Sequence, residues 1–340
     1  MTDIEFYAMC LSQKLRKHFC KNYNIPIKIF EDPYFTDRCI LFNDYYGVQE
    51  KIKEYFEDVS KYDNEQEFFA YDNEIMQNII DYLKSNEKMA YFSQMENMNQ
   101  FAVPDRYKNI PAKDVWRDSC VNNVFLSVDL KKANFQALKH YSNEIFSGAE
   151  TWEEFVGKFT DEKSKIHSKH LRQVIFGSVN PRRQCIYEKY LMCTILDRLG
   201  PILQDVYCLN NDEAVFSIGG IYASKLGTLR SFVQDQIEKG LHLDCHINIF
   251  TVQKLGKDMY QQSFIAGLSD DGANVKFKKV SHLMLPFVIR NKRGEQPKES
   301  DFVFKNETGN LCRFLENPLE EELLGAVYYN GSFVFSLTNF

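Results

Sequence analysis

The segment Val124-Phe-Leu-Ser-Val-Asp129 decides the fold, because an apolar run there ends in a carboxylate. Apolar and β-branched residues over 124–128 predict a strand with Asp129 at its C-terminal edge. The residues that follow, from Leu130 to Tyr141, have the apolar spacing of a helix, and Lys131 and Lys132 at the junction are expected to face solvent. Asp129 is then either a metal ligand at a strand end or the N-cap of that helix.

A second acidic element lies further along the chain, at Asn210-Asn-Asp-Glu213. The flanking segments 206–209 and 214–218 are β-prone, and the two asparagines are typical of a turn. The pattern predicts a hairpin with Asp212 and Glu213 at its tip. The alternative is that both carboxylates are solvated turn residues.

The chain between the two acidic elements is basic. The segment 163–189 has seven Lys and Arg residues against Glu188 alone, although the formal net charge of the protein is −6. Lys169 and Arg172 lie three residues apart on one face of a predicted helix, as a phosphate clamp requires. A basic segment within an acidic protein suits a local anion site, and the alternative is a solvated helix face.

Carboxylates on two rigid elements, with cations between them, suit phosphoryl transfer. This reaction with two metal ions needs carboxylates that bracket metals roughly 3.5–4 Å apart. Mg²⁺ prefers oxygen ligands and keeps several waters, so that two or three carboxylates suffice. The pattern therefore favours Asp129 and Asp212 as ligands of two Mg²⁺ or Mn²⁺ ions, with Glu213 beside them. Lys169 and Arg172 would neutralise an incoming triphosphate.

The composition is that of an ordinary soluble chain, with 340 residues of which 44% are hydrophobic and 26% charged. No run approaches the roughly 18–20 apolar residues of a membrane span, and no signal peptide is recognisable. The nine cysteines lack CxxC spacing, so we expect reduced thiols and a cytoplasmic location. Abundant Lys, Asn, Tyr and Phe are typical of an AT-rich genome and favour a virus or mobile element. The host cytoplasm or nucleoid would then be the location.

Three regions are expected along the chain, and the fold class is α+β. Residues 1–105 are predicted to form a helical, acidic N-terminal region. Residues 106–255 are expected to hold a central antiparallel sheet backed by helices. Residues 256–340 are predicted to be a β-rich subdomain, with strands that include 283–290 and a hairpin over 326–337.

The strand that ends in Asp129, the basic helix with Arg172 and the hairpin with Asp212 together resemble motifs A, B and C of palm-domain nucleic-acid polymerases. The strand that ends in Asp129 resembles motif A, and Asn211-Asp-Glu213 is similar to the His-Asp-Glu of motif C in family A DNA polymerases. Arg172 precedes Phe176 by four positions, as a Lys or Arg precedes a Phe in the family A fingers helix. The short interval from motif A to motif C is closer to that of reverse transcriptases, although their Tyr-x-Asp-Asp and Leu-Pro-Gln-Gly sequences are absent.

The resemblance implies a role for each matching residue. Asp129 and Asp212 match the metal-binding carboxylates, and Glu213 matches the supporting carboxylate. Arg172 matches the cation that binds the triphosphate, and Phe176 matches the ring that packs against the nascent base pair. The resemblance also implies a palm fold that binds nucleotides and nucleic acid.

Further residues are predicted to contact the substrates. Asn134 and Phe135 lie where palm enzymes carry the residue that senses the sugar 2′ position, and for Phe135 the alternative is core packing. Arg182 and Arg183 follow a proline at a predicted helix start, where backbone amides also attract anions. Together with Lys189 they are predicted to contact the phosphate backbone of nucleic acid, and the alternative is that they face solvent.

The function expected from these patterns is transfer of nucleotides to a 3′-hydroxyl, directed by a template. The partners would be a nucleic-acid template and primer and nucleoside triphosphates, with no membrane. Two alternatives stay open. One is a palm without chemistry that serves as a nucleic-acid-binding subunit. The other is a palm that makes cyclic or short oligonucleotides without a template.

Overall fold

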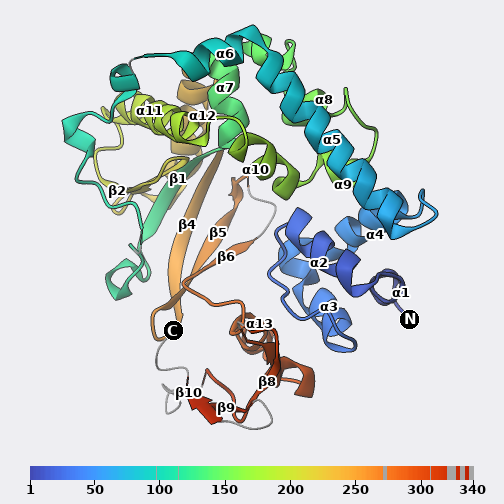
Figure 1. The fold of residues 1–340 in the computed structure, drawn as a ribbon. Helices are drawn as coiled ribbons and strands as arrows, with labels where there is room; N and C mark the ends of the chain where they lie inside the picture. The colour runs from blue at the N-terminus through green and yellow to red at the C-terminus, as the bar shows by residue number, and fades with distance from the viewer. Residues whose placement is uncertain are drawn as a thin grey trace.

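A six-stranded antiparallel sheet forms the centre of the protein in a computed structural model, which confirms the α+β class (Figure 1). The structure describes residues 1–96, 98–113, 115–270, 274–306, 308–319, 327–329 and 334–336. The strand order is β2-β3-β1-β4-β5-β6. The bounds are β1 Val124–Leu130, β2 Val206–Leu209, β3 Glu213–Ser217, β4 Cys245–Gly256, β5 Met259–Ser269 and β6 Val275–Lys278.

Helices cover one face of this sheet, and the opposite face carries a smaller apolar cluster that includes Trp116, Phe125 and Phe250. Leu126, Val128 and Leu130 on β1 belong to one large apolar core with α7, α11 and α12. Because side chains alternate along a strand, Phe125 and Asp129 lie on the opposite face. The three helices are α7 Ala133–Tyr141, α11 Pro181–Leu199 and α12 Leu226–Leu241.

Shorter helices pack around the same large core. Their bounds are α6 Glu87–Gln94, α8 Trp152–Val156, α9 Lys163–Ile166 and α10 Lys169–Gly177. Single 3₁₀ turns lie at η1 Met98–Phe101, η2 Asp105–Tyr107, η3 Asp118–Cys120, η4 Asn143–Phe146, η5 Ala223–Lys225 and η6 Glu299–Phe302. Among the described helices, none is both long enough and apolar enough to cross a membrane.

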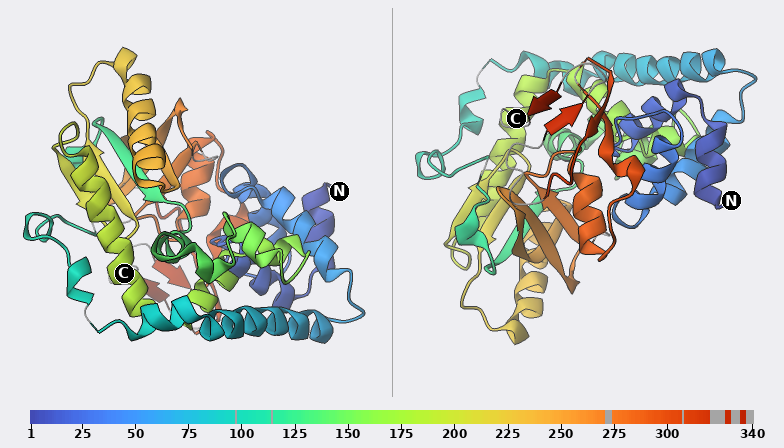
Figure 2. Two further views of the ribbon diagram at one scale, coloured as in Figure 1. Left: turned by 90° about the horizontal axis from the view of Figure 1, so that it is seen from above. Right: turned by 90° about the horizontal axis from the view of Figure 1, so that it is seen from below.

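The N-terminal helices pack around a second core. They are α1 Asp3–Cys10, α2 Gln13–Asn22, α3 Tyr34–Tyr46, α4 Val48–Val59 and α5 Glu65–Ser85. This second core also contains Leu285, Ile289 and Val303 from the C-terminal region. In α5, Phe68 belongs to the second core, whereas Ile79 belongs to the core of the large sheet. Figure 2 shows α5 and α6 along one side of the molecule, joining the two parts.

The observed cores do not follow the predicted region boundaries. The first boundary, at residue 105, lies beyond the point in α5 where the chain passes from one core to the other. The second boundary, at residue 255, falls within the large sheet, because β4, β5 and β6 pair with one another across it. Hydrogen bonding between strands, which no local pattern specifies, therefore extends the central sheet as far as Lys278.

The C-terminal region contains a helix where a strand was predicted. The predicted strand over residues 283–290 is wrong, because α13 spans Leu285–Lys292. Pro286 lies in the first turn of this helix, where proline is tolerated. A second sheet follows, in the order β10-β9-β8-β7. It confirms the strands of the predicted hairpin over 326–337, whose turn lies outside the described residues. The bounds are β7 Val303–Lys305, β8 Leu311–Phe314, β9 Val327–Tyr329 and β10 Val334–Ser336.

Candidate active site

The two predicted acidic elements lie side by side at one end of the sheet. Asp129 on β1 is the direct partner of Glu213 on β3 in the antiparallel register. The amide of Leu130 donates to the carbonyl oxygen of Asp212 at 2.8 Å, which joins the end of β1 to the turn. Side chains of directly opposite residues lie on the same face with Cβ atoms about 4.5–5.5 Å apart. Asp129 and Glu213 therefore lie on the same face of the sheet, opposite the helices.

The electrostatics of Asp129 reflect this crowding. Its pKa is raised to about 7 by burial first, then by repulsion from Glu213 and Asp212, while Lys276 and Lys278 on β6 act in the opposite direction. A carboxylate whose like-charged neighbours keep it partly protonated gains free energy when a cation binds beside it. The site is thus electrostatically suited to positive charge.

The donor atoms fit a hard divalent cation in kind, although they are not assembled as a complete ligand set. Asp129, Asp212 and Glu213 supply only oxygen donors, which Mg²⁺ and Mn²⁺ prefer. Within the described residues, no three His, Cys, Asp or Glu side chains are grouped closely enough to hold a metal ion by themselves. Asp129 and Asp212 would hold the ion, and water and substrate oxygens would complete its coordination.

Glu188 is a fourth carboxylate at this end of the sheet, and it was not among the site residues predicted from the sequence. It lies on α11 with 4% exposure and accepts a hydrogen bond from the side-chain amide of Asn134 at 2.8 Å. Burial, followed by repulsion from Asp212, raises the pKa of Glu188 to about 7, and the hydrogen bond from Asn134 opposes this. Two features of the sequence could have identified Glu188 as a site residue. It has the spacing of the buried residues of α11, and it is the only acidic residue in the basic segment 163–189.

The raised pKa values predict that stability increases as pH falls. Above about pH 7 the buried carboxylates of Asp129 and Glu188 are charged in the folded protein, which costs free energy. Between pH 7 and about 4.5 the folded protein keeps protons that the unfolded chain releases, so the free energy of unfolding rises as pH falls. Glu188→Gln should raise it by about 1–2 kcal/mol at pH 8 and by little at pH 5.

Urea unfolding followed by circular dichroism at pH 5, 6, 7 and 8 measures this effect. Glu57→Gln on α4 is the matched control, because Glu57 is exposed and should leave the pH profile of the wild type unchanged. A Glu188→Gln profile parallel to that of the wild type would contradict the burial of a charge at this position.

Lys189 supports the acidic hairpin from within. Its ammonium donates to the carbonyl oxygens of Leu209 at 2.6 Å and Asn210 at 3.1 Å, just before the turn. These contacts use the side chain that was predicted to bind nucleic acid. Lys189→Met should lower the free energy of unfolding by about 1–3 kcal/mol, because two backbone acceptors lose a charged donor. Thermal melting measures the loss, and Arg182→Met, exposed on the same helix, should change it by less than about 0.5 kcal/mol.

The two predicted nucleotide-binding aromatics lie in the core. Phe135 and Phe176 are each 1% exposed. The ring of Phe135 packs against Phe146 with 4.5 Å between centroids, and Phe176 packs against Trp152 at 5.3 Å. Neither ring therefore offers a surface to a nucleotide in this structure. An aromatic residue at helical spacing serves a core equally well, and local sequence does not separate the two roles.

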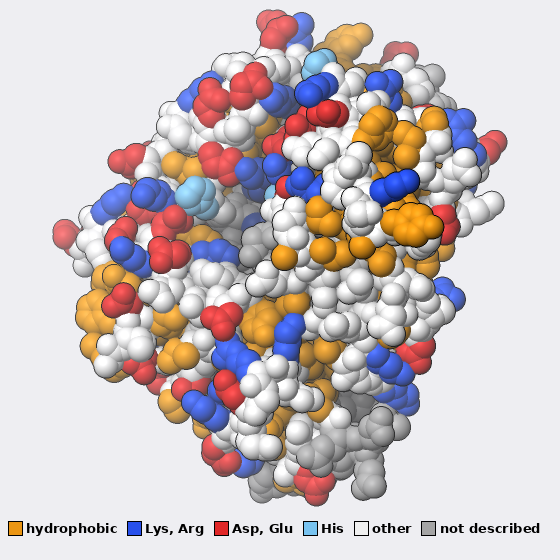
Figure 3. Space-filling view, turned by 180° about the vertical axis from the view of Figure 1, so that it is seen from behind, with side chains coloured by type: hydrophobic (Ala, Val, Ile, Leu, Met, Phe, Trp, Pro, Cys, Tyr) orange, Lys and Arg blue, Asp and Glu red, His pale blue; other side chains and the backbone are white. Residues whose placement is uncertain are grey.

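The predicted cations are divided between the surface and the interior. Lys169 and Arg182 are exposed, as a ligand contact requires. Arg183 is half-buried and donates to the carbonyl oxygen of Met95 at 2.5 Å, which fixes the segment before η1. Arg172 is half-buried beside Glu153. Figure 3 shows basic and acidic side chains interspersed over one face of the molecule, so that face presents no continuous basic surface.

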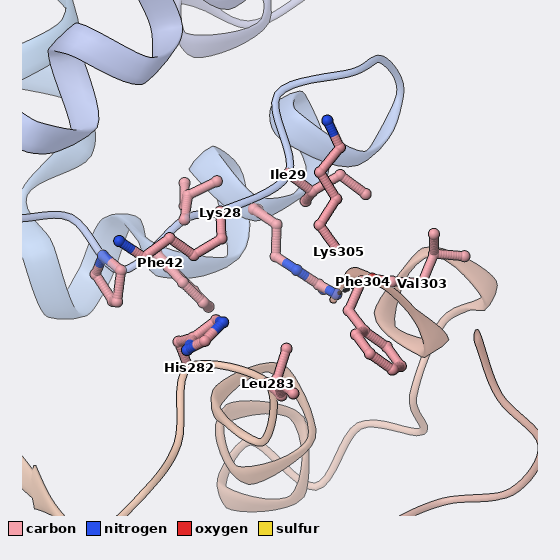
Figure 4. Close-up of a pocket in the computed structure, with 11 residues that line it drawn as sticks. Lys28, Ile29, Phe42, His282, Leu283, Val303, Phe304 and Lys305 are labelled. Carbon is pink, nitrogen blue, oxygen red and sulfur yellow. Dashed lines mark hydrogen bonds between the residues drawn. The ribbon is translucent and has the colours of Figure 1, made fainter. Parts of the chain in front are cut away.

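The linings of two pockets include none of these carboxylates. One is lined by residues that include Lys28, Arg38 and His282, between the N-terminal helices and the C-terminal region (Figure 4). Its volume of about 20 Å³ suits a single water molecule. The other, of about 350 Å³, is lined by residues that include Gln136 and His242. Neither contains a predicted site residue, so the candidate site is defined by the strand register.

Comparisons of this chain with protein-family models, with curated proteins and with solved structures found no match, so the resemblance to palm polymerases stays a prediction from the sequence.

Proposed function

We propose that this chain is a Mg²⁺- or Mn²⁺-dependent nucleotidyltransferase that adds nucleotides to a 3′-hydroxyl under the direction of a template. The observation that carries the proposal is the register of Asp129 against Glu213, with Asp212 in the adjoining turn. These carboxylates lie on the face of an antiparallel sheet that is opposite the helices. The nine cysteines are free thiols, which supports the expected cytoplasmic location.

The chain's own residues would perform binding and positioning. Divalent ions, when bound, would lower the pKa of the attacking hydroxyl and neutralise charge on the leaving pyrophosphate. Asp129 and Asp212 would hold them, and Asp129 must first lose the proton that its surroundings favour. Activity should therefore increase between pH 6 and pH 8, as the pKa of about 7 implies. Lys189 would hold the hairpin that carries Asp212 in place.

Primer extension tests the proposal directly. Wild type and Asp212→Asn are incubated with a primed template, all four dNTPs or all four NTPs, and Mg²⁺ or Mn²⁺. We expect template-dependent extension by the wild type, little by Asp212→Asn, and wild-type activity in Asp205→Asn, whose exposed carboxylate precedes the same hairpin. Extension by Asp212→Asn at the wild-type rate would remove this carboxylate from the mechanism.

A second candidate, the nucleic-acid-binding subunit without chemistry, is favoured by one observation. In the described part of the chain, the carboxylates do not form a group that could hold a metal ion alone. This candidate predicts binding of labelled single-stranded DNA or RNA with an affinity that Mg²⁺ and Asp212→Asn leave unchanged, and no extension. Products formed from nucleotides without a primer would instead identify a template-independent synthase.

A further inference from the structure

A cluster of two cations and one carboxylate lies where the chain leaves β1. The ammonium of Lys132 contacts both carboxylate oxygens of Glu153 on α8. Arg172 on α10 is attracted to the same carboxylate. Lys132 therefore pairs with Glu153 directly, and Arg172 lies within the electrostatic field of the same carboxylate.

The position of Lys132 is unfavourable for its backbone. Its φ is 51°, in the left-handed region that side chains with a Cβ atom rarely adopt. As the N-cap of α7, it also makes no side-chain hydrogen bond to the helix. Glycine or asparagine would adopt this conformation with less strain. Strained residues are common at functional sites, because the surrounding structure imposes them. In this conformation the Lys132 ammonium contacts Glu153, whereas its sequence position predicted a side chain that faces solvent.

The other cation is incompletely satisfied. The Nε atom of Arg172 is buried and has no hydrogen-bond partner among the described residues. Burial lowers the pKa of Arg172, and the Glu153 carboxylate opposes this. A guanidinium that is removed from water without making its hydrogen bonds costs free energy, and an additional anion would recover part of it. The cluster thus favours an anionic ligand over solvent.

We propose that Lys132 and Arg172 bind the triphosphate of the incoming nucleotide, and that Glu153 is an internal competitor that holds these cations until the nucleotide arrives. The identification of the ligand as a nucleoside triphosphate rests on the proposed function, whereas the anion site does not. Phosphate oxygens would replace the Glu153 carboxylate on the ammonium, and no covalent bond would form or break. Because Lys132 follows Asp129 by three residues, the phosphates would be held at the same end of β1 as the carboxylate pair.

Phosphate is the better partner for these cations. A triphosphate carries several negative charges, and its oxygens accept paired hydrogen bonds from a guanidinium. Glu153 offers one negative charge, and its side chain is 33% exposed, so it can move into water when it is displaced. When no nucleotide is present, the Glu153 carboxylate keeps the two cations close together. Because it competes with phosphate, it lowers the affinity of the site for the nucleotide. Glu153 is therefore a positioning residue whose removal should increase affinity.

The test is calorimetric titration of the full chain with inorganic tripolyphosphate in the absence of divalent metal. Relative to the wild type, Lys132→Gln and Arg172→Gln should weaken binding by about tenfold or more, as loss of a charged hydrogen bond implies. Glu153→Gln should tighten binding by about tenfold. The control is Lys131→Gln, because Lys131 pairs with Asp244 and should leave the affinity within about twofold.

Trp152 provides a second, local measurement. It precedes Glu153 and packs against Phe176 on α10, and the chain has one other tryptophan, Trp116. In a Trp116→Phe background, the fluorescence of Trp152 should change on titration with tripolyphosphate at the same concentrations as the calorimetric signal. Circular dichroism establishes that each variant is folded, and Lys132→Gln decides the test if Arg172→Gln does not fold.

Unchanged or weaker binding by Glu153→Gln would overturn the competitor role, and wild-type affinity in folded Lys132→Gln would overturn the site. Primer extension in parallel separates this inference from the proposed function. Binding in the predicted order without extension would keep the anion site and contradict the polymerase. Extension in which all four variants share the wild-type KM for nucleotide would keep the polymerase and contradict this inference.

Discussion

Asp129→Asn should abolish nucleotidyl transfer and make the protein more stable. A carboxylate that holds a catalytic metal ion contributes several kcal/mol to the transition state, so we expect the rate to fall by roughly 10³-fold or more. The same carboxylate is buried beside Glu213 and Asp212, which raises its pKa from 3.8 to about 7. Asparagine removes this charge. The free energy of unfolding at pH 8 should therefore increase by about 2–4 kcal/mol.

The two effects are measured together, by primer extension and by urea unfolding at pH 8. The control is Asp118→Asn, because the pKa of Asp118 is lowered by hydrogen bonds from Lys254 and Tyr260. Asp118→Asn should therefore retain activity and lose stability, whereas Asp129→Asn should lose activity and gain stability. Loss of activity together with loss of stability in Asp129→Asn would mean that this carboxylate supports the fold. At pH 5 the stability gain should be smaller, because the wild-type carboxyl is then largely protonated.

The second large effect is expected where the N-terminal and C-terminal regions meet. The Asp301 side chain is fully buried between two arginines. It accepts from Arg38 on α3 at 2.5 Å and from Arg290 on α13 at 3.0 Å. Asp301→Ala leaves the buried guanidinium of Arg38 without its carboxylate, while Arg290 keeps its ion pair with Glu295. Because removal of one member of a buried ion cluster leaves uncompensated charge, the free energy of unfolding should fall by about 3–5 kcal/mol.

A surface ion pair at the same junction provides the control. Asp44 on α3 pairs with Arg293 at 2.6 Å, but the Asp44 side chain is 68% exposed. Asp44→Ala should cost about 1 kcal/mol or less, since solvent already screens this pair. Urea unfolding at pH 7 compares the two variants. Equal losses for Asp301→Ala and Asp44→Ala would show that burial does not strengthen the Asp301 cluster.

Patterns between neighbours in the chain predicted many elements well. Residues 1–105 were predicted to be helical, and the helical spacing of Val48, Ile52 and Tyr55 is found in α4, Val48–Val59. The apolar run before Asp129 became β1, and the segments on both sides of Asn210-Asn211 became β2 and β3. Amphipathic spacing and turn residues act over a few positions, so they are visible without knowledge of the rest of the fold.

Short apolar runs were the main source of error in secondary structure. In α13 every residue from Leu285 to Arg290 is buried, so the segment has no polar face whose spacing would distinguish a helix from a strand. Phe135 and Phe176 present the same difficulty on a smaller scale, because a buried ring and a ligand-binding ring have the same local pattern. Burial by distant parts of the chain decides between them.

The sequence alone determined that carboxylates stand at a strand end and at a hairpin turn, with a basic segment between them. Only the tertiary structure decided that Glu213 is the direct partner of Asp129, that Glu188 is buried nearby, and that Lys132 contacts Glu153. These relations depend on strand register and helix packing, which bring together residues far apart in the chain. Local patterns arise from the geometry of a few consecutive residues, whereas burial and its effect on pKa arise from the assembled core.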